Sequence, residues 1–295
     1  MSTAAAIGRA APGVSVFTAI VRETVAESTG AKTFRLDPGV PASYRAGQYV
    51  TIDPHQFAGL RSLIGFLERA KRRSEAPRAY SLSSAPGERY LAVTVKEEAF
   101  DPDHHQYPPL LSGFLVHQLR AGDALSLRGF VGSYTLTDEV AAETDHLLHL
   151  CAGSGSVANL SILKDSLQRH SHVRHTFVYS NRTWEDVIFR SELRAIQNCW
   201  GQRVRIIHRL TRDTTPLPGE VEVARGRIDV DLLQTLLVKD PKSRVFVCGP
   251  GVSVRERRAA AVQGMVPAPR FIETVLGYLA ALDVPRAYVK VETYG

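Results

Sequence analysis

Two glycines in the second half of the chain have a spacing that can bind phosphate. Gly153, Gly155 and Ala158 match the pattern Gly-x-Gly-x-x-Gly/Ala, directly after an apolar run and at the start of a predicted helix. Glycines let the backbone approach a pyrophosphate, and the free N–H groups of a helix start attract its charge. We therefore predict a dinucleotide-binding loop that includes Ser154 and Ser156. A purely structural tight turn is the alternative.

The next predicted strand ends in Ser180, Asn181 and Arg182, with no acid before Glu185. A site for NAD usually places Asp or Glu near this point to accept hydrogen bonds from the ribose hydroxyls. A hydroxyl, an amide and a guanidinium suit a 2′-phosphate better. The segment therefore favours NADPH over NADH, against the alternative that Arg182 is a surface cation.

Cys248, Gly249 and Pro250 end another predicted parallel strand, at the sheet edge where ligands bind in open α/β sheets. A buried cysteine is as often a small core residue, so position alone leaves both interpretations of Cys248 open. Cys151 is predicted in the core, and Cys199 in the core or as a surface filler.

The run Arg-Ala-Tyr-Ser-Leu-Ser-Ser, residues 78–84, combines an arginine, a tyrosine and three serines in a way that packing alone does not explain. A structural strand could use Tyr80 but would gain little from the nearby guanidinium and three hydroxyls.

These residues need a scaffold, and the first half of the chain reads as β structure. Short runs of alternating or β-branched residues, separated by Gly and Pro, predict an antiparallel barrel. The predicted strands are 14–21, 32–36, 48–52, 90–96 and 124–129. One helix-like run, 111–119, interrupts them.

Beyond the polar stretch 137–145, strands alternate with helices, one of which is expected over 185–197; this predicts βαβ units and a parallel sheet covered on both faces. The expected fold class is α+β with two domains. We predict a flexible tail at 1–13, a barrel domain at 14–140 and an α/β domain at 145–295.

The segment 55–77 lies between two predicted barrel strands and fits neither half. It carries an apolar Leu-Ile-Gly-Phe-Leu run followed by a cluster of basic residues. The favoured interpretation is a surface helix with a solvated face. The alternative is a docking or lid element that touches an acidic partner.

Composition restricts the function classes. The formal net charge of +6 over 295 residues is too mild and dispersed to indicate nucleic acid binding. No apolar run reaches the roughly 18 residues of a membrane span, and the N-terminus does not resemble a secretory signal. Three scattered cysteines suit a reducing, cytoplasmic compartment and cannot hold an iron–sulfur cluster. His104 and His105 lie in a polar loop without metal-ligand spacing, so no metal site is predicted.

These motifs, in this order, resemble the ferredoxin–NADP(+) reductase family of flavoproteins over residues 14–295, apart from the segment 55–77. Residues 78–84 resemble the flavin signature of that family, and residues 111–119 its short helix over the FAD pyrophosphate. Residues 132–136 (Gly-Ser-Tyr-Thr-Leu) are similar to the end of its barrel. The segments 152–159, 179–193, 245–250 and 289–295 resemble its nicotinamide-domain motifs. Two departures are Val252 and Val254 in place of a usual Met, and Val-Ala-Asn at 157–159 in place of Ile-Ala/Thr-Pro.

The resemblance implies roles for individual residues. Tyr80 would pack on the isoalloxazine, Ser81 would hydrogen-bond near flavin N5, and Arg78 would pair with the FAD phosphates, which Ser112 would cap. Lys96 would lie on the phosphate or nicotinamide side, unless it is a surface charge at a strand end. The remaining implied flavin-binding positions are Ala79, Val95, Leu111 and Gly113.

By the same resemblance, Cys248 and Glu292 would flank the nicotinamide and act with Ser81 as the catalytic group. Tyr294 has two interpretations. It would be either an aromatic residue stacked over the flavin or a residue of the type that precedes an attached iron–sulfur domain.

The implied function is transfer of electrons from NADPH or NADH through FAD to a one-electron acceptor. No attached iron–sulfur domain is expected, so the acceptor would be a separate ferredoxin or oxygenase component, and the protein a monomer or weak oligomer. The alternatives are a free flavin or ferric-chelate reductase, and a non-catalytic flavin- or nucleotide-binding module that senses redox state.

Overall fold

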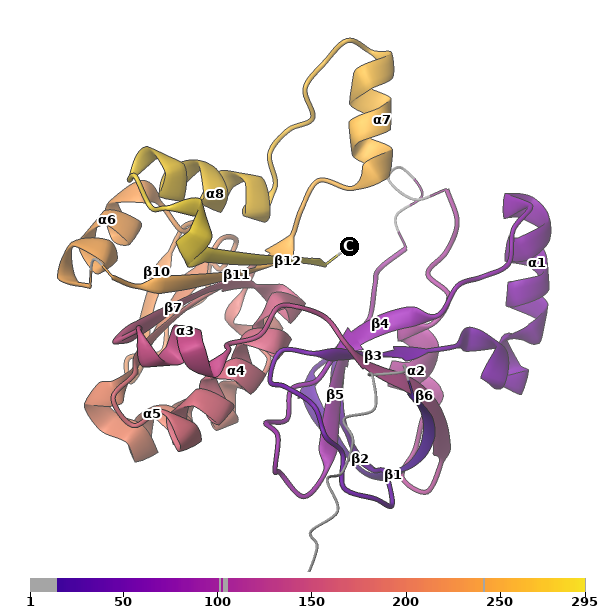
Figure 1. Ribbon diagram of the computed structural model, residues 1–295. Helices are drawn as coiled ribbons and strands as arrows, with labels where there is room; N and C mark the ends of the chain where they lie inside the picture. Colours follow the sequence, from indigo (N-terminus) through magenta and orange to yellow (C-terminus); the bar gives the residue numbers. More distant parts are fainter. Residues whose placement is uncertain (1–14, 101, 103–105, 241, 295) are drawn as a thin grey trace, which may run out of the picture.

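The computed structural model describes residues 15–100, 102, 106–240 and 242–294. The predicted tail at 1–13 lies outside them. Figure 1 shows a barrel, coloured indigo to magenta, beside an α/β unit coloured magenta to yellow. Among the described residues, no helix is long and apolar enough to cross a membrane.

The N-terminal unit is the predicted antiparallel barrel, and the sequence-based fold class is confirmed. Its six strands are β1 (Ser15–Ser28), β2 (Ala31–Asp37), β3 (Tyr49–Ile52), β4 (Arg78–Ser81), β5 (Leu91–Lys96) and β6 (Ala124–Val131). Their order is β4-β3-β6-β1-β2-β5, and a bridge between Leu82 and Val93 draws the two edge strands together. The barrel therefore places the end of β4 beside β5.

Short helices cover the barrel. The 3₁₀ turns η1 (Pro54–Gln56) and η2 (Ala58–Leu60) lead into α1 (Arg61–Lys71), which buries Ile64 and Leu67 in the barrel core. The opposite face of α1 is exposed, so the segment 55–77 contains the expected surface helix. The helix α2 (Ser112–Gln118) buries Leu115 and Val116 in the same core.

The C-terminal unit is a fully parallel sheet, as predicted. Its strands are β7 (His146–Ala152), β8 (Arg174–Asn181), β9 (Val204–Leu210), β10 (Glu222–Arg225), β11 (Arg244–Pro250) and β12 (Val289–Tyr294). Their order is β10-β9-β8-β7-β11-β12. The chain moves from β7 to one side of the sheet and later returns to the other side at β11. The topological switch point, where open α/β sheets bind ligands, therefore lies between β7 and β11.

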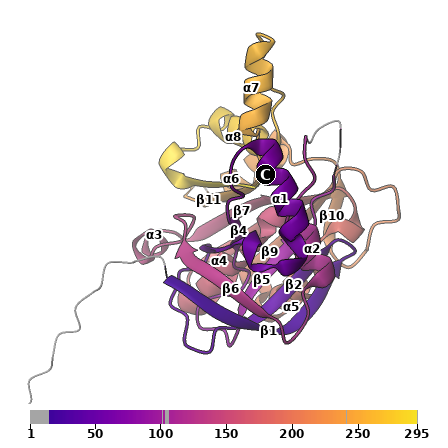
Figure 2. The same ribbon diagram turned by 90° about the vertical axis from the view of Figure 1, so that its right-hand side faces the viewer.

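Helices cover both faces of this sheet. On one face α4 (Ser156–Arg169) and α5 (Arg190–Trp200) pack on the strands, and on the other α6 (Val230–Lys239) and α8 (Phe271–Ala281) do so. The helix α7 (Val254–Val262) projects from the body of the molecule (Figure 2). The remaining turns are η3 (Gly153–Gly155), η4 (Trp184–Asp186), η5 (Gly201–Arg203) and η6 (Arg286–Tyr288).

The segment between the sheets packs on the second one. It contains α3 (Asp138–Ala142), whose Ala141 lies in one apolar cluster with Ala158 and Ile162 of α4. Tyr134 joins the same cluster. The predicted boundary between the two domains, at residues 140–145, remains a prediction. Tyr134 precedes that boundary and already packs in the core of the α/β unit.

Several elements differ from the expectation. The helix expected over 185–197 begins only at Arg190, because Phe189 has a left-handed backbone with φ 61° and a buried ring. The first strand continues from its expected end at 21 to Ser28. The short elements β4, β10 and α7 were not predicted from the apolar pattern, because two of them are only four residues long and α7 is almost entirely exposed.

Candidate active site

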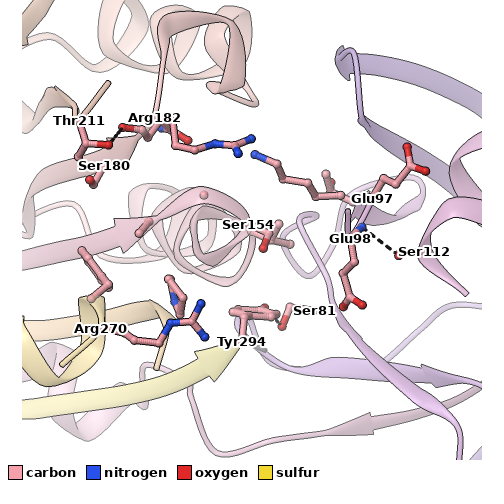
Figure 3. Close-up of a pocket in the computed structure, with 18 of the residues that line it drawn as sticks. Ser81, Glu97, Glu98, Ser112, Ser154, Ser180, Arg182, Thr211, Arg270 and Tyr294 are labelled. Carbon is pink, nitrogen blue, oxygen red and sulfur yellow. Dashed lines mark hydrogen bonds between the residues drawn. The ribbon is translucent and has the colours of Figure 1, made fainter. Parts of the chain in front are cut away.

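A cavity of about 950 Å³ opens between the barrel and the carboxyl edge of the parallel sheet. Most of the predicted site residues line it, and they come from both units: Arg78, Ala79, Tyr80, Ser81, Lys96, Leu111, Ser112, Gly153, Ser154, Ser180, Asn181, Arg182, Pro250 and Tyr294. Figure 3 shows Arg182 on one wall, with Glu97, Glu98 and Ser112 on the opposite wall. The fold thus brings together residues that are more than 200 positions apart.

The barrel wall carries the run at residues 78–81, which forms β4. Along it Ala79 is exposed and Ser81 is buried. Arg78 donates to Glu75 Oε2 at 2.5 Å, and Lys71 donates to the other oxygen of this buried carboxylate at 2.6 Å. The segment before β4 thereby holds the Arg78 guanidinium itself at the cavity wall. Burial raises the pKa of Tyr80, so its ring presents a neutral face.

Ser112 lies at the start of α2 and is buried at the cavity edge. Its Oγ accepts a hydrogen bond from the Glu98 backbone N–H at 3.1 Å (Figure 3). An accepting hydroxyl retains its own proton, so Ser112 still has a hydrogen bond to donate.

The glycine loop passes so close to β11 that a side chain would not fit. A Cβ on Gly155 would lie 2.2 Å from the Cys248 carbonyl oxygen, and Gly153 has a left-handed φ of 54°. The Gly153 carbonyl accepts from Ser156 Oγ and from Tyr179 Oη, each at 3.0 Å. These contacts fix the loop, and they turn the Ser156 hydroxyl inward rather than into the cavity.

The wall at the end of β8 has an unsatisfied polar group. Both amide atoms of Asn181 are buried without a hydrogen-bond partner, although the residue lines the cavity. Buried amides in proteins are normally paired, so this one is unusual, but its two polar atoms are closed off from the cavity and other atoms of the residue line it. Arg182 is 61% exposed and pairs with Asp186 four residues later.

Cys248 and Glu292 are neighbours in the register of β11 and β12. Burial raises the pKa of Cys248 well above its ordinary value, and the Glu292 charge adds to this, so Cys248 is a protonated thiol. Burial also raises the pKa of Glu292 to about 7, although Ser81 offers it a hydrogen bond that acts in the opposite direction. Glu292 Oε2 has no hydrogen-bond partner.

Tyr294 closes this corner. Its hydroxyl donates to Ser81 Oγ, and Figure 3 shows the two side chains side by side. Part of the ring packs on the cluster that contains Tyr134 and Cys248. A ring that bound against Ser81 would therefore have to stack on Tyr294 or displace it.

Some predicted residues do not line the cavity: Val95, Gly113, Gly155, Ser156, Cys248, Gly249 and Glu292. Val95 and Cys248 point into the cores of their units, because side chains alternate between the faces of a strand. Gly155 and Gly249 serve close packing. A Cβ on Gly249 would lie 2.7 Å from the Phe271 ring.

Sequence reasoning missed several lining residues. They lie near the ends of strands or near the starts of helices: Thr94, Glu97, Glu98, Leu110, Ala152, Val157, Thr211, Arg212, Arg227, Ile228, Pro269, Arg270, Phe271, Thr274 and Val275. Arg212 follows the end of β9 by two residues, so the strand-end rule applied to Cys248 would have found it.

The lining is strongly basic. Six Lys or Arg side chains face two carboxylates around the cavity. Such an excess attracts a phosphorylated ligand. No group of His, Cys, Asp and Glu that could hold a metal was found among the described residues. Of the loop considered for a metal, Asp101, Asp103, His104 and His105 lie outside them.

Comparison with known proteins agrees with this geometry. Residues 150–255 match the family model described as an oxidoreductase NAD-binding domain. The chain is 28% identical over 242 residues to flavohemoprotein A of Dictyostelium discoideum, covering 78% of this chain and 53% of that protein. It is 29% identical over 260 residues to the ferredoxin reductase component of a 3-ketosteroid-9-alpha-monooxygenase from Mycobacterium tuberculosis, covering 88% and 62%. The chain thus spans less than two thirds of the length of these curated relatives.

Solved structures share the whole fold. The FAD/NAD-binding domain of a nitric oxide dioxygenase from Vibrio cholerae superposes with a TM-score of 0.68 at 23% identity, covering 95% of this chain and 98% of that one. The ferredoxin–NADP+ reductase of Plasmodium falciparum, solved with 2′P-AMP, gives a TM-score of 0.67 at 14% identity, covering 95% and 96%. The chain belongs to the ferredoxin–NADP(+) reductase-like family of FAD- and NAD(P)-binding oxidoreductases.

Proposed function

We propose that this protein is an FAD-dependent reductase that takes electrons from NADPH, or less readily from NADH, and passes them singly to a protein acceptor. The observation that carries the proposal is the single basic cavity into which the barrel's Arg-Ala-Tyr-Ser segment and the glycine loop both open. Bound FAD would accept a hydride from the nicotinamide and release its electrons one at a time.

The residues present fit both cofactors. Arg78 and the free donor of Ser112 suit the FAD diphosphate, and the neutral ring of Tyr80 suits a flat heterocycle. Lys96 lies at the cavity wall next to them. On the opposite wall, the glycine loop suits a nicotinamide nucleotide. A 2′-phosphate would find Ser180 and Arg182 at the end of β8.

Of the three residues expected to be catalytic, Ser81 would position the reacting rings directly, whereas Cys248 and Glu292 do not line the cavity and would act only through the groups packed beside Ser81. Ser81 is buried and offers a hydroxyl at the cavity wall. Cys248 keeps its proton at neutral pH because its pKa is raised by burial, so it is a core thiol and not a thiolate nucleophile. Glu292, with a pKa of about 7, changes its charge in the working pH range and can hold or release a proton beside Ser81.

The acceptor would be a separate one-electron carrier, such as a ferredoxin or an oxygenase component. One curated relative is named as the ferredoxin reductase component of a monooxygenase, and one solved neighbour as the ferredoxin reductase in carbazole 1,9a-dioxygenase. The three cysteines are all unpaired, which suits the proposed cytoplasmic location.

The exposed face of α1 is a candidate dock for an acidic acceptor. Arg69, Arg72 and Arg73 are exposed there, beside Phe66, which is 50% exposed. Charge reversal at these three arginines should lower acceptor turnover and flatten its salt dependence, while reduction by NADPH stays unchanged. Lys71 is excluded from this test because it pairs with the buried Glu75. Unchanged acceptor turnover and salt dependence would refute the dock.

Anaerobic stopped-flow mixing of the flavin-loaded protein with NADPH, and separately with NADH, tests the proposal. Fast bleaching of the flavin absorbance is expected, and faster with NADPH. Turnover of free flavin or a ferric chelate without any protein acceptor would favour the alternative reductase activity. A yellow protein that neither nucleotide bleaches would indicate a non-catalytic binding module. A colourless protein that takes up no added FAD would refute the assignment of residues 78–84.

A further inference from the structure

Arg182 does not face the cavity as a free cation. Its Nη2 donates to Asp186 Oδ1 at 3.0 Å, and its Nε approaches Oδ2 at 3.3 Å. The Thr183 hydroxyl donates to the same Oδ2 at 3.1 Å. One two-donor edge of the guanidinium is therefore already occupied by a carboxylate.

The same carboxylate reaches across to the barrel. Lys96 Nζ, at the end of β5, lies 3.5 Å from Asp186 Oδ1. Lys96 and Arg182 both line the cavity, whereas Asp186 does not. Asp186 therefore lies behind two cations, one from each unit, and neutralises part of their charge from the side away from the cavity.

The two cations lower the pKa of Asp186. Burial alone would raise the pKa of Asp186, but the hydrogen bond from Arg182 and the charges of Lys96 and Arg182 hold it below the ordinary value. Asp186 is 19% exposed, so this ion pair is less screened than a surface pair. The carboxylate is thus a resident anion on one edge of the Arg182 guanidinium, and a ligand phosphate would have to share Arg182 with it.

We propose that Asp186 is a specificity-determining residue, which weakens binding of a 2′-phosphate by occupying Arg182 and thereby reduces the preference for NADPH over NADH. This inference rests on the proposed function and deepens it, because it names the group that sets the nucleotide preference. A ligand with a 2′-phosphate must share Arg182 with Asp186 or displace it. A ligand without that phosphate leaves the ion pair as it is.

The test is calorimetric titration of the flavin-loaded protein with two probes, adenosine 2′,5′-bisphosphate and 5′-AMP. The substitution D186N keeps the shape of the side chain and an oxygen that can accept from Thr183, but removes the charge. Binding of the bisphosphate should tighten about fivefold, the upper range for one exposed ion pair, while 5′-AMP binding changes less than about twofold. The tightening should shrink at high salt.

A double variant separates this mechanism from a general charge effect. In the R182Q background, D186N should no longer favour the bisphosphate, because Arg182 is the group through which Asp186 acts. Equal tightening of both probes, or a gain that persists without Arg182, would overturn the inference. If the wild type binds both probes and D186N changes neither, the inference alone is wrong. If the wild type binds neither probe, and neither NADPH nor NADH bleaches the flavin, the proposed function fails and the inference with it.

Discussion

Replacing Glu292 by glutamine should stabilise the protein at alkaline pH and leave it unchanged at acid pH. Glu292 lies on β12 beside Cys248, with one carboxylate oxygen buried and unpaired. Burial raises its pKa from 4.5 to about 7 in the folded chain. Because the pKa of this carboxyl is higher in the folded state, the native protein holds a proton that the unfolded chain has already released.

The magnitude follows from that difference. Each pH unit between about 4.5 and 7 removes roughly 1.4 kcal/mol from the free energy of unfolding, so the loss reaches on the order of 3 kcal/mol above pH 7. Below pH 4.5 both states are protonated and the penalty is absent. A glutamine carries no charge at any pH, so E292Q should escape the loss.

Urea unfolding at pH 5 and pH 8, followed by tryptophan fluorescence, measures this. Both tryptophans, Trp184 and Trp200, lie in the same α/β unit as Glu292. E292Q should exceed the wild type by about 2–3 kcal/mol at pH 8 and by less than about 1 kcal/mol at pH 5. E185Q, which removes a carboxylate that is 80% exposed, is the control and should differ by less than about 0.5 kcal/mol at either pH. A pH-independent difference for E292Q would refute the reasoning.

Two further predictions concern the cavity walls. G155A should lower the thermal midpoint by several degrees and weaken nucleotide binding, because its Cβ would lie 2.2 Å from the Cys248 carbonyl oxygen. G219A is the matched control, because no atom lies within 4 Å of the Cβ that it adds. Equal thermal midpoints for the two variants would contradict the packing argument. Y294F removes the hydroxyl that donates to Ser81 but keeps the ring, so the rate of flavin reduction by NADPH should change less than about threefold. Y294A also removes the ring, so it should expose the flavin and shift its absorbance spectrum. The same spectral shift in both variants would show that the flavin environment depends on the hydroxyl and not on the ring.

The sequence predicted the two units well because their patterns differ in kind. The strand β6 alternates exposed and buried residues, as a barrel strand must, whereas β7 is buried along nearly its whole length, as a central parallel strand must be. The helix start at Arg190 was missed, because nothing in the apolar pattern reveals that Phe189 adopts a left-handed backbone. Tertiary contacts fix that residue, since its N–H donates to Glu27 of the barrel at 2.9 Å.

The candidate site shows the same limit at the level of single side chains. Strand ends can be recognised in the sequence, and Ser180, Asn181 and Arg182, at the end of β8, do line the cavity. Which charged side chains pair with one another depends on the fold and cannot be taken from strand-end positions.

Arg182 alone favours a 2′-phosphate, yet the pairing with Asp186 depends on η4 following β8 and on β5 ending opposite them. An arginine whose carboxylate partner is already in place attracts a second anion less than its residue type suggests, because the two anions compete for the same donors and repel each other. On the proposal above, the nucleotide preference of this chain would depend on Asp186 as well as on Arg182, and a sequence pattern that considers only the arginine would overestimate it.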